Sequence, residues 1–131
     1  VSREIRKYFN NVKVIGIDIE GSMIFSNDPK PRRFPGMGAS KKSSLIKDAF
    51  IDGHIILSER EIEQGCKSLF NDYNVLAGIS GGAAFYAAQL YNKKTNYKGK
   101  SLVLIPDSGE DYLELLDYQN KQIKEEKNEI Y

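Results

Sequence analysis

The chain has 131 residues, of which 40% are hydrophobic, and a formal net charge of +1. This length allows one domain with a modest core but not two domains of ordinary size. The basic residues are spread along the chain and no stretch approaches the roughly 18 apolar residues of a membrane span, so we expect neither nucleic acid nor a membrane as partner. The single cysteine, Cys66, excludes an internal disulfide and a cysteine-based metal site. A reducing, cytoplasmic compartment fits, and we expect no metal.

The first third of the chain predicts a helix, a strand and a long loop. Apolar residues at helical spacing indicate a short helix over residues 2–9, with Ser2 as a possible N-cap. Residues 12–18 read as a buried strand. A loop rich in Pro, Gly and Arg follows over residues 27–42, and loops of this length in compact domains are usually functional or mobile.

The middle of the chain predicts a second strand and two helices. Residues 54–57 form a short apolar strand, and Ser58 with Glu61 then makes a capping box that begins a helix ending near Tyr73. Cys66 lies on the apolar face of this helix, so we interpret it as a core thiol. An alanine-rich helix follows to about residue 92, with Ser80 as a candidate cap.

A third strand is predicted at residues 102–105, where four branched aliphatic residues precede Pro106. Such a run is typical of a strand buried on both faces. Ligands of open α/β sheets bind beyond the carboxyl ends of strands, which makes Ser108 the first functional candidate. The alternation of elements predicts an α/β fold with a mostly parallel sheet and helices on both faces, a Rossmann-like three-layer arrangement. Residues 119–131 are mostly polar and predict a solvated helix or tail.

Four motifs in order resemble the fold type II pyridoxal-phosphate enzymes of the cysteine synthase and cystathionine β-synthase group. They are V-K-V-I-G-I-D-I-E-G-S at residues 12–22, P-G-M-G-A-S at 35–40, L-A-G-I-S-G-G-A-A at 76–84 and S-L-V-L-I-P-D-S-G-E-D-Y at 101–112. The sequence departs from the pattern at Asp111, where cysteine synthases usually carry Arg, and at Gly82, which replaces a Ser. By this resemblance residues 1–118 are the C-terminal portion of such an enzyme domain.

The resemblance implies pyridoxal 5'-phosphate as cofactor and a β-replacement reaction on an activated serine, O-acetylserine or O-phosphoserine. It places Ser108 at the pyridine nitrogen of the cofactor, and Ser80 and Gly81 in the wall of the cofactor site. It makes Gly36, Gly38, Ala39 and Ser40 a loop that closes over the amino-acid substrate.

Other parts of the machinery are expected elsewhere. The Schiff-base lysine and the main phosphate loop of these enzymes lie upstream of the equivalent of Val1, so this chain is expected to hold no catalytic residue and to be inactive alone. Its expected partners are the missing N-terminal half of the same enzyme and a second copy in a homodimer.

Some alternatives stay open. P-G-M-G-A-S is similar to the branch that joins O-phosphoserine to glutamate in siderophore assembly, and there Arg32, Arg33, Lys41 and Lys42 would either help an anionic second substrate or form a plain solvated surface. A Rossmann-like nucleotide domain is a second hypothesis, although Gly36-x-Gly38 lacks the third glycine. A non-catalytic α/β binding or interaction module is a third.

Overall fold

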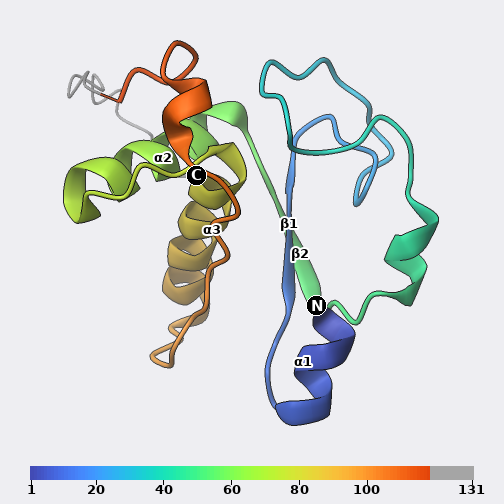
Figure 1. Ribbon diagram of the computed structural model, residues 1–131. Helices are drawn as coiled ribbons and strands as arrows, with labels where there is room; N and C mark the ends of the chain where they lie inside the picture. The colour runs from blue at the N-terminus through green and yellow to red at the C-terminus, as the bar shows by residue number, and fades with distance from the viewer. Residues whose placement is uncertain (119–131) are drawn as a thin grey trace.

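The computed structural model describes residues 1–118, which form a small parallel sheet flanked by helices (Figure 1). The elements in chain order are helix α1 (Ser2–Tyr8), strand β1 (Ile15–Ile19), the short 3-10 helix η1 (Ser44–Asp48), strand β2 (Gly53–Leu57), helices α2 (Glu59–Tyr73) and α3 (Ile79–Thr95), and the 3-10 helix η2 (Gly109–Tyr112). The predicted α/β class with a parallel sheet is confirmed. The predicted tail at residues 119–131 lies outside the described residues.

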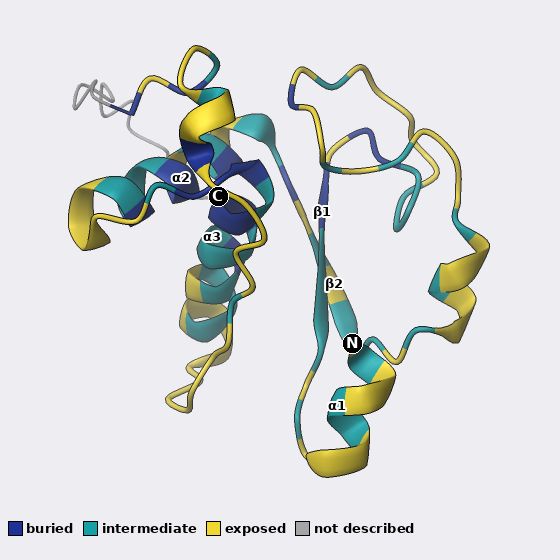
Figure 2. Cartoon of the chain, viewed as in Figure 1, coloured by how far each residue is buried: buried dark blue, intermediate teal, exposed yellow. Residues whose placement is uncertain are grey.

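The sheet sets the direction of the structure, because β1 and β2 are parallel and in register from Ile15 opposite Gly53 to Ile19 opposite Leu57. Both strands are most buried at their carboxyl ends. Ile15 and Gly53 are half-buried, whereas Ile19 and Leu57 at the carboxyl ends are almost fully buried (Figure 2). The core therefore lies near the carboxyl end of the sheet, where helices α2 and α3 pack.

Helix α2 begins where the sequence predicts. The Ser58 hydroxyl accepts the N–H of Glu61, and the Glu61 carboxylate accepts the N–H of Ser58, so the capping box is complete. This pairing satisfies backbone donors that would otherwise lack partners at the helix start. The buried face of the helix includes Ile62, Cys66 and Leu69.

Helices α2 and α3 cross at two glycines. A Cβ added at Gly65 would meet the carbonyl oxygen of Gly82, and a Cβ added at Gly82 would meet the sulfur of Cys66. Helix α3 begins at Ile79 with Gly78 as its N-cap, so the expected cap at Ser80 is wrong. Ser80 lies within the first turn of the helix instead.

Helix α1 begins at Ser2 with Val1 at the N-cap position, so the expected cap at Ser2 is wrong as well. The Ser2 hydroxyl accepts the N–H of Phe50 instead. Arg6 forms an ion pair with Asp52, whose carboxylate also accepts the N–H of Val14. These contacts attach the helix to the segment that enters β2.

The expectation of a buried strand at residues 102–105 is wrong. This segment has no regular secondary structure, and Leu102 and Leu104 are 85% and 62% exposed. Ile105 of this segment packs against Gly81 of α3. A strand needs a neighbour for its N–H and C=O groups, and within residues 1–118 only β1 and β2 pair as strands. The segment is apolar as predicted, but residues 1–118 hold no strand that pairs with it.

The crossing of α2 and α3 gives the first prediction. Gly65→Ala should lower the free energy of unfolding by about 2 kcal/mol, because the added methyl group meets a backbone carbonyl that cannot rotate away. Urea denaturation measures this. Gln64→Ala changes the exposed neighbouring position of the same helix and should leave stability nearly unchanged. If the two variants unfold at the same urea concentration, the close packing of α2 on α3 is contradicted.

Candidate functional site

The loop containing P-G-M-G-A-S is attached to the end of β1. The buried Ser22 hydroxyl accepts the N–H of Ala39 at 3.0 Å, and the Ala39 carbonyl accepts the N–H of Met23 at 2.8 Å. Gly38 has a φ of +78°, and a Cβ there would lie 2.8 Å from Ile19 and 2.9 Å from Ser22. Only glycine fits this combination of positive φ and close packing. The loop therefore has a fixed position beyond the carboxyl end of the sheet.

A second pair of motifs joins the start of α3 to the segment after Pro106. The N–H of Gly78 donates to the carbonyl of Asp107 at 3.1 Å, and the N–H of Gly109 donates to the carbonyl of Leu76 at 3.0 Å. Ala77 and Ser108 face each other as an isolated antiparallel bridge. These backbone bonds place Ser108 directly beside the entry to α3.

Tyr112 brings the two pairs of motifs together. Its hydroxyl donates to Asp107 Oδ2 at 3.0 Å, and a Cβ at Gly36 would lie 3.6 Å from the same hydroxyl. The hydrogen bond to Asp107 raises the pKa of Tyr112. All four sequence motifs thus meet at one end of the fold, with Gly36 and Ser108 both close to the Tyr112 and Asp107 pair.

The remaining predicted site residues differ in their surroundings. Ser108 is exposed, and its hydroxyl accepts the N–H of Glu110 at 3.3 Å as the cap of η2, so its hydrogen can still be donated. Ser80 is half-buried in the first turn of α3. Gly81 is buried against Ile105, so the structure gives it a packing role. Ser40 receives a hydrogen bond from Arg32.

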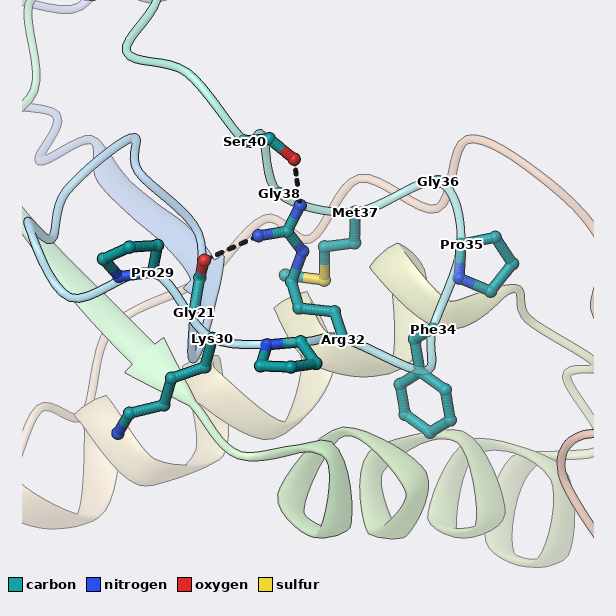
Figure 3. A pocket seen from close by; sticks show the side chains of 11 residues that line it. Gly21, Pro29, Lys30, Arg32, Phe34, Pro35, Gly36, Met37, Gly38 and Ser40 are labelled. Atoms are coloured by element: carbon teal, nitrogen blue, oxygen red, sulfur yellow. Dashed lines mark hydrogen bonds between the residues drawn. The ribbon is translucent and has the colours of Figure 1, made fainter.

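An open pocket of about 570 Å³ lies between the end of β1 and this loop (Figure 3). Arg32 spans it. One guanidinium nitrogen donates to the carbonyl of Gly21 at 2.6 Å and the other donates to the Ser40 hydroxyl at 3.3 Å, as the dashed lines in Figure 3 show. The lining residues are Gly21, Pro29, Lys30, Pro31, Arg32, Phe34, Pro35, Gly36, Met37, Gly38 and Ser40. In the sequence Arg32 is one of four basic residues near the glycine loop, and its position relative to the loop does not distinguish it from the adjacent Arg33.

A buried carboxylate also escaped the sequence analysis. Asp18 is 3% exposed, and its Oδ1 accepts the N–H of Ile19, while its Oδ2 has no hydrogen-bond partner in the part of the chain that the structure describes. Polar oxygens in such positions are normally paired. The residue type alone could not show that Asp18 is buried, because the first three residues of β1 are half-buried and only Asp18 and Ile19 are fully buried.

Two further classes of site are not seen within residues 1–118. No group of three His, Cys, Asp or Glu side chains is placed to hold a metal ion there. No helix in that range is long and apolar enough to cross a membrane.

Cys66 has the surroundings of a core thiol. It is fully buried, its Sγ donates to the carbonyl of Gly78 at 3.7 Å, and burial raises the pKa of the thiol to about 11. Thiolate is the reactive form, so a raised pKa makes the residue inert. The same surroundings raise the pKa of Tyr118, whose hydroxyl donates to Ala77 O at 2.8 Å.

Comparison with known proteins identifies relatives of the chain. No protein-family model matches it. N-(2-amino-2-carboxyethyl)-L-glutamate synthase of Ralstonia nicotianae is 31% identical over 114 residues, which are 87% of this chain and 34% of that enzyme. The O-acetylserine-dependent cystathionine β-synthase of Helicobacter pylori matches with a TM-score of 0.78 and 26% identity, over 86% of this chain and 37% of the other.

The chain is a relative of the fold type II pyridoxal-phosphate enzymes of the cysteine synthase and cystathionine β-synthase group. A hydrogen sulfide-producing enzyme of Fusobacterium nucleatum agrees, with a TM-score of 0.78, 28% identity and coverage of 86% of this chain and 39% of the other. The resemblance inferred from the four motifs is thereby confirmed. The chain spans only about a third of the length of these relatives.

The environment of Cys66 gives the second prediction. At pH 8 a soluble disulfide reagent should react with the folded chain roughly 100-fold more slowly than with the chain unfolded in urea, because a pKa raised from 9.0 to about 11 lowers the thiolate fraction by that factor. The rate for the folded chain should continue to rise up to about pH 11, whereas that for the unfolded chain should level off near pH 10, about one unit above the ordinary pKa of 9.0. Cys66 is the only cysteine, so the reaction reports one site. Equal rates for the two states would contradict a buried thiol.

Proposed function

We propose that this chain is the C-terminal portion of a pyridoxal-phosphate-dependent β-replacement enzyme, which replaces the β-substituent of an activated serine to make cysteine or a related amino acid. The convergence of four motifs at the carboxyl end of the sheet supports this proposal most directly. Ligands bind at that end in open α/β folds. Here it carries the Ser108 hydroxyl beside the start of α3, and a glycine loop that approaches the same region through Gly36 and Tyr112.

Ser108 is proposed to contact the pyridine nitrogen of the cofactor. Its hydroxyl is exposed and retains a hydrogen to donate, whereas the neighbouring Asp107 carboxylate is occupied by Tyr112. A hydroxyl is neutral and would leave the pyridine nitrogen unprotonated. Bound pyridoxal phosphate supplies an electron sink, and this sink is weaker when the pyridine nitrogen is unprotonated. A weaker sink favours β-elimination over reactions that need a long-lived carbanion. The residues present therefore fit the cofactor's ring.

The loop at Gly36, Gly38, Ala39 and Ser40 is proposed to line the substrate side of this site, with Ser80 and Gly81 in the opposite wall. Hydrogen bonds to Ser22 and Met23 hold Ala39 in place, while Gly36 stays exposed near Tyr112. A loop fixed at one end can change conformation at the other without leaving the sheet. This is the behaviour needed to admit and then enclose an amino acid.

The preceding portion of the enzyme is proposed to cover this chain and to bring the Schiff-base lysine, so that the chain alone is inactive. Two observations support a missing neighbour. Leu102 and Leu104 are exposed, although they belong to a strongly apolar segment, and Asp18 Oδ2 is buried without a donor in residues 1–118. A buried acceptor left unpaired costs about 1–3 kcal/mol, which a backbone N–H from a neighbouring strand would recover. Assembly as a cytoplasmic homodimer is part of the proposal.

Within the group, the proposed substrates are O-phosphoserine and glutamate, as in siderophore assembly. The Ralstonia relative is named for a glutamate-derived product, and P-G-M-G-A-S is similar to this branch. An interaction module without catalytic activity is the alternative, since the exposed segment at residues 102–105 would also suit a protein partner.

The third prediction tests cofactor binding by the polypeptide that joins this chain to the preceding portion. After incubation with pyridoxal phosphate and dialysis, it should retain a visible absorbance band that the 131-residue chain alone does not. Ser108→Ala should shift this band and lower activity, because the hydroxyl contacts the ring. Ser101→Ala is the matched control, since Ser101 bonds to Asn92 and has no proposed role.

An unchanged spectrum for Ser108→Ala would contradict the assignment of Ser108. Absence of the band from the longer polypeptide would contradict the enzyme proposal as a whole and favour the interaction module.

A further inference from the structure

The pocket beside the glycine loop carries positive charge and no negative charge. Its lining includes Lys30 and Arg32 but no Asp or Glu. Lys30 is already paired with Asp28 at 3.1 Å and also feels the charge of Glu20, which together raise the pKa of Lys30. The charge that remains without compensation in the pocket is therefore that of Arg32.

Arg32 differs from its neighbour in what it contacts. Arg33 faces the carboxylates of Glu59 and Glu63, and no carboxylate lies within ion-pair range of Arg32 in the part of the chain that the structure describes. The contacts of Arg32 are two neutral oxygens, Gly21 O and Ser40 Oγ. Its side chain nevertheless arches over the pocket and is half-buried (Figure 3).

This arrangement leaves donors available for a ligand. A guanidinium group has five N–H donors, and the two bonds to Gly21 and Ser40 use two of them. The bond to Gly21 O is short and fixes the orientation of the group before any ligand arrives. A carboxylate can accept two parallel hydrogen bonds from such a group, and these charge-assisted bonds are about twice as strong as neutral ones.

Some loop residues that line the pocket also have backbone amides without acceptors in the described part of the chain. Gly36 and Gly38 both have positive φ, and the N–H groups of Gly36, Met37 and Gly38 have no acceptor among residues 1–118. Successive amides with alternating conformation form concave surfaces that attract anions. The amides and the guanidinium group, which lie in the same loop between β1 and η1, thus favour the same kind of ligand.

We infer that Arg32 anchors a carboxylate of the second substrate, a small amine that carries negative charge, with the amides of residues 36–38 as additional donors. The identity of the ligand as second substrate rests on the proposed function, but the pocket is built only from residues 21–40 of this chain. Its volume of about 570 Å³ lies within the range of small-molecule sites and exceeds what a single inorganic ion needs.

The fourth prediction is tested by titrating the complete ¹⁵N-labelled 131-residue chain with L-glutamate and following its amide resonances. Saturable shifts are expected at Gly36, Gly38 and Ser40. Arg32→Gln should raise the Kd at least about tenfold, because it removes the charge and the paired donors. Arg33→Gln is the matched control and should bind as the unmodified chain does, since Arg33 faces Glu59 outside the pocket.

Several results would overturn the inference: no saturable shift, the same shifts with sodium chloride at equal ionic strength, or equal affinities for Arg32→Gln and Arg33→Gln. Arg32→Lys keeps the charge and loses the paired geometry, so it should bind with intermediate affinity. If Arg32→Gln does not fold, an Arg32→Lys variant that binds as tightly as the unmodified chain contradicts the inference.

The two proposals fail separately. Suppose that the longer polypeptide retains pyridoxal phosphate but the 131-residue chain does not bind glutamate through Arg32. The enzyme proposal is then supported, and the proposed role of Arg32 is contradicted. Glutamate binding that depends on Arg32, without retention of cofactor, leaves a carboxylate site and removes its assignment to a second substrate.

Discussion

The close crossing of α2 and α3 at Gly65 and Gly82 determines where the other functional segments lie. Because no side chain separates the helices there, Cys66 packs on Gly82 and donates to the carbonyl of Gly78. Gly78 in turn lies so close to Asp107 that a Cβ on Gly78 would overlap its carboxylate, and their backbones are hydrogen-bonded. The position of Ser108 beside the start of α3 therefore depends on how α2 and α3 pack against each other. A larger residue at the crossing would move the candidate site as well as lower stability.

A second anchor is the buried hydroxyl of Ser22, which holds the opposite side of the site. It accepts the N–H of Ala39 and so attaches a glycine loop to the end of β1. The two anchors act on different segments, and they meet only through Gly36 and Tyr112. Two groups near the site keep hydrogen-bonding capacity that these contacts do not use. They are the hydroxyl hydrogen of Ser108 and the charged guanidinium group of Arg32. The groups proposed to contact ligands are thus ones that keep hydrogen-bonding capacity after the contacts that hold the site together are made.

Local interactions explain which features the sequence could predict. The capping box of Ser58 and Glu61 involves residues three positions apart, and the strand at β2 lies directly before it, so both are visible in a short window. The order of the four motifs along the chain is likewise visible in the sequence, and the structure brings them together around Tyr112. The failures depend on distant contacts. Leu102 to Ile105 has the composition of a buried strand, but composition cannot supply a strand to pair with. Likewise, Gly78, the N-cap of α3, contacts Cys66 of another helix, and Arg32 is distinguished from Arg33 by the groups that fold up against each of them.

Covering the exposed apolar segment at residues 102–105 would also affect Arg32, because both lie on surfaces that the proposed preceding portion of the enzyme would approach. In the chain alone, water solvates the part of Arg32 that the pocket leaves open, so the missing counter-charge costs little. A covering portion that buries Leu102 and Leu104 and approaches the loop would remove some of that water. The attraction between Arg32 and a carboxylate would then strengthen, because Coulomb energy rises as the effective dielectric constant falls. Affinity for an anionic substrate would thereby increase on assembly without any change in the residues that contact it. The affinity measured for the chain alone is, on this argument, a lower bound on that of the assembled site.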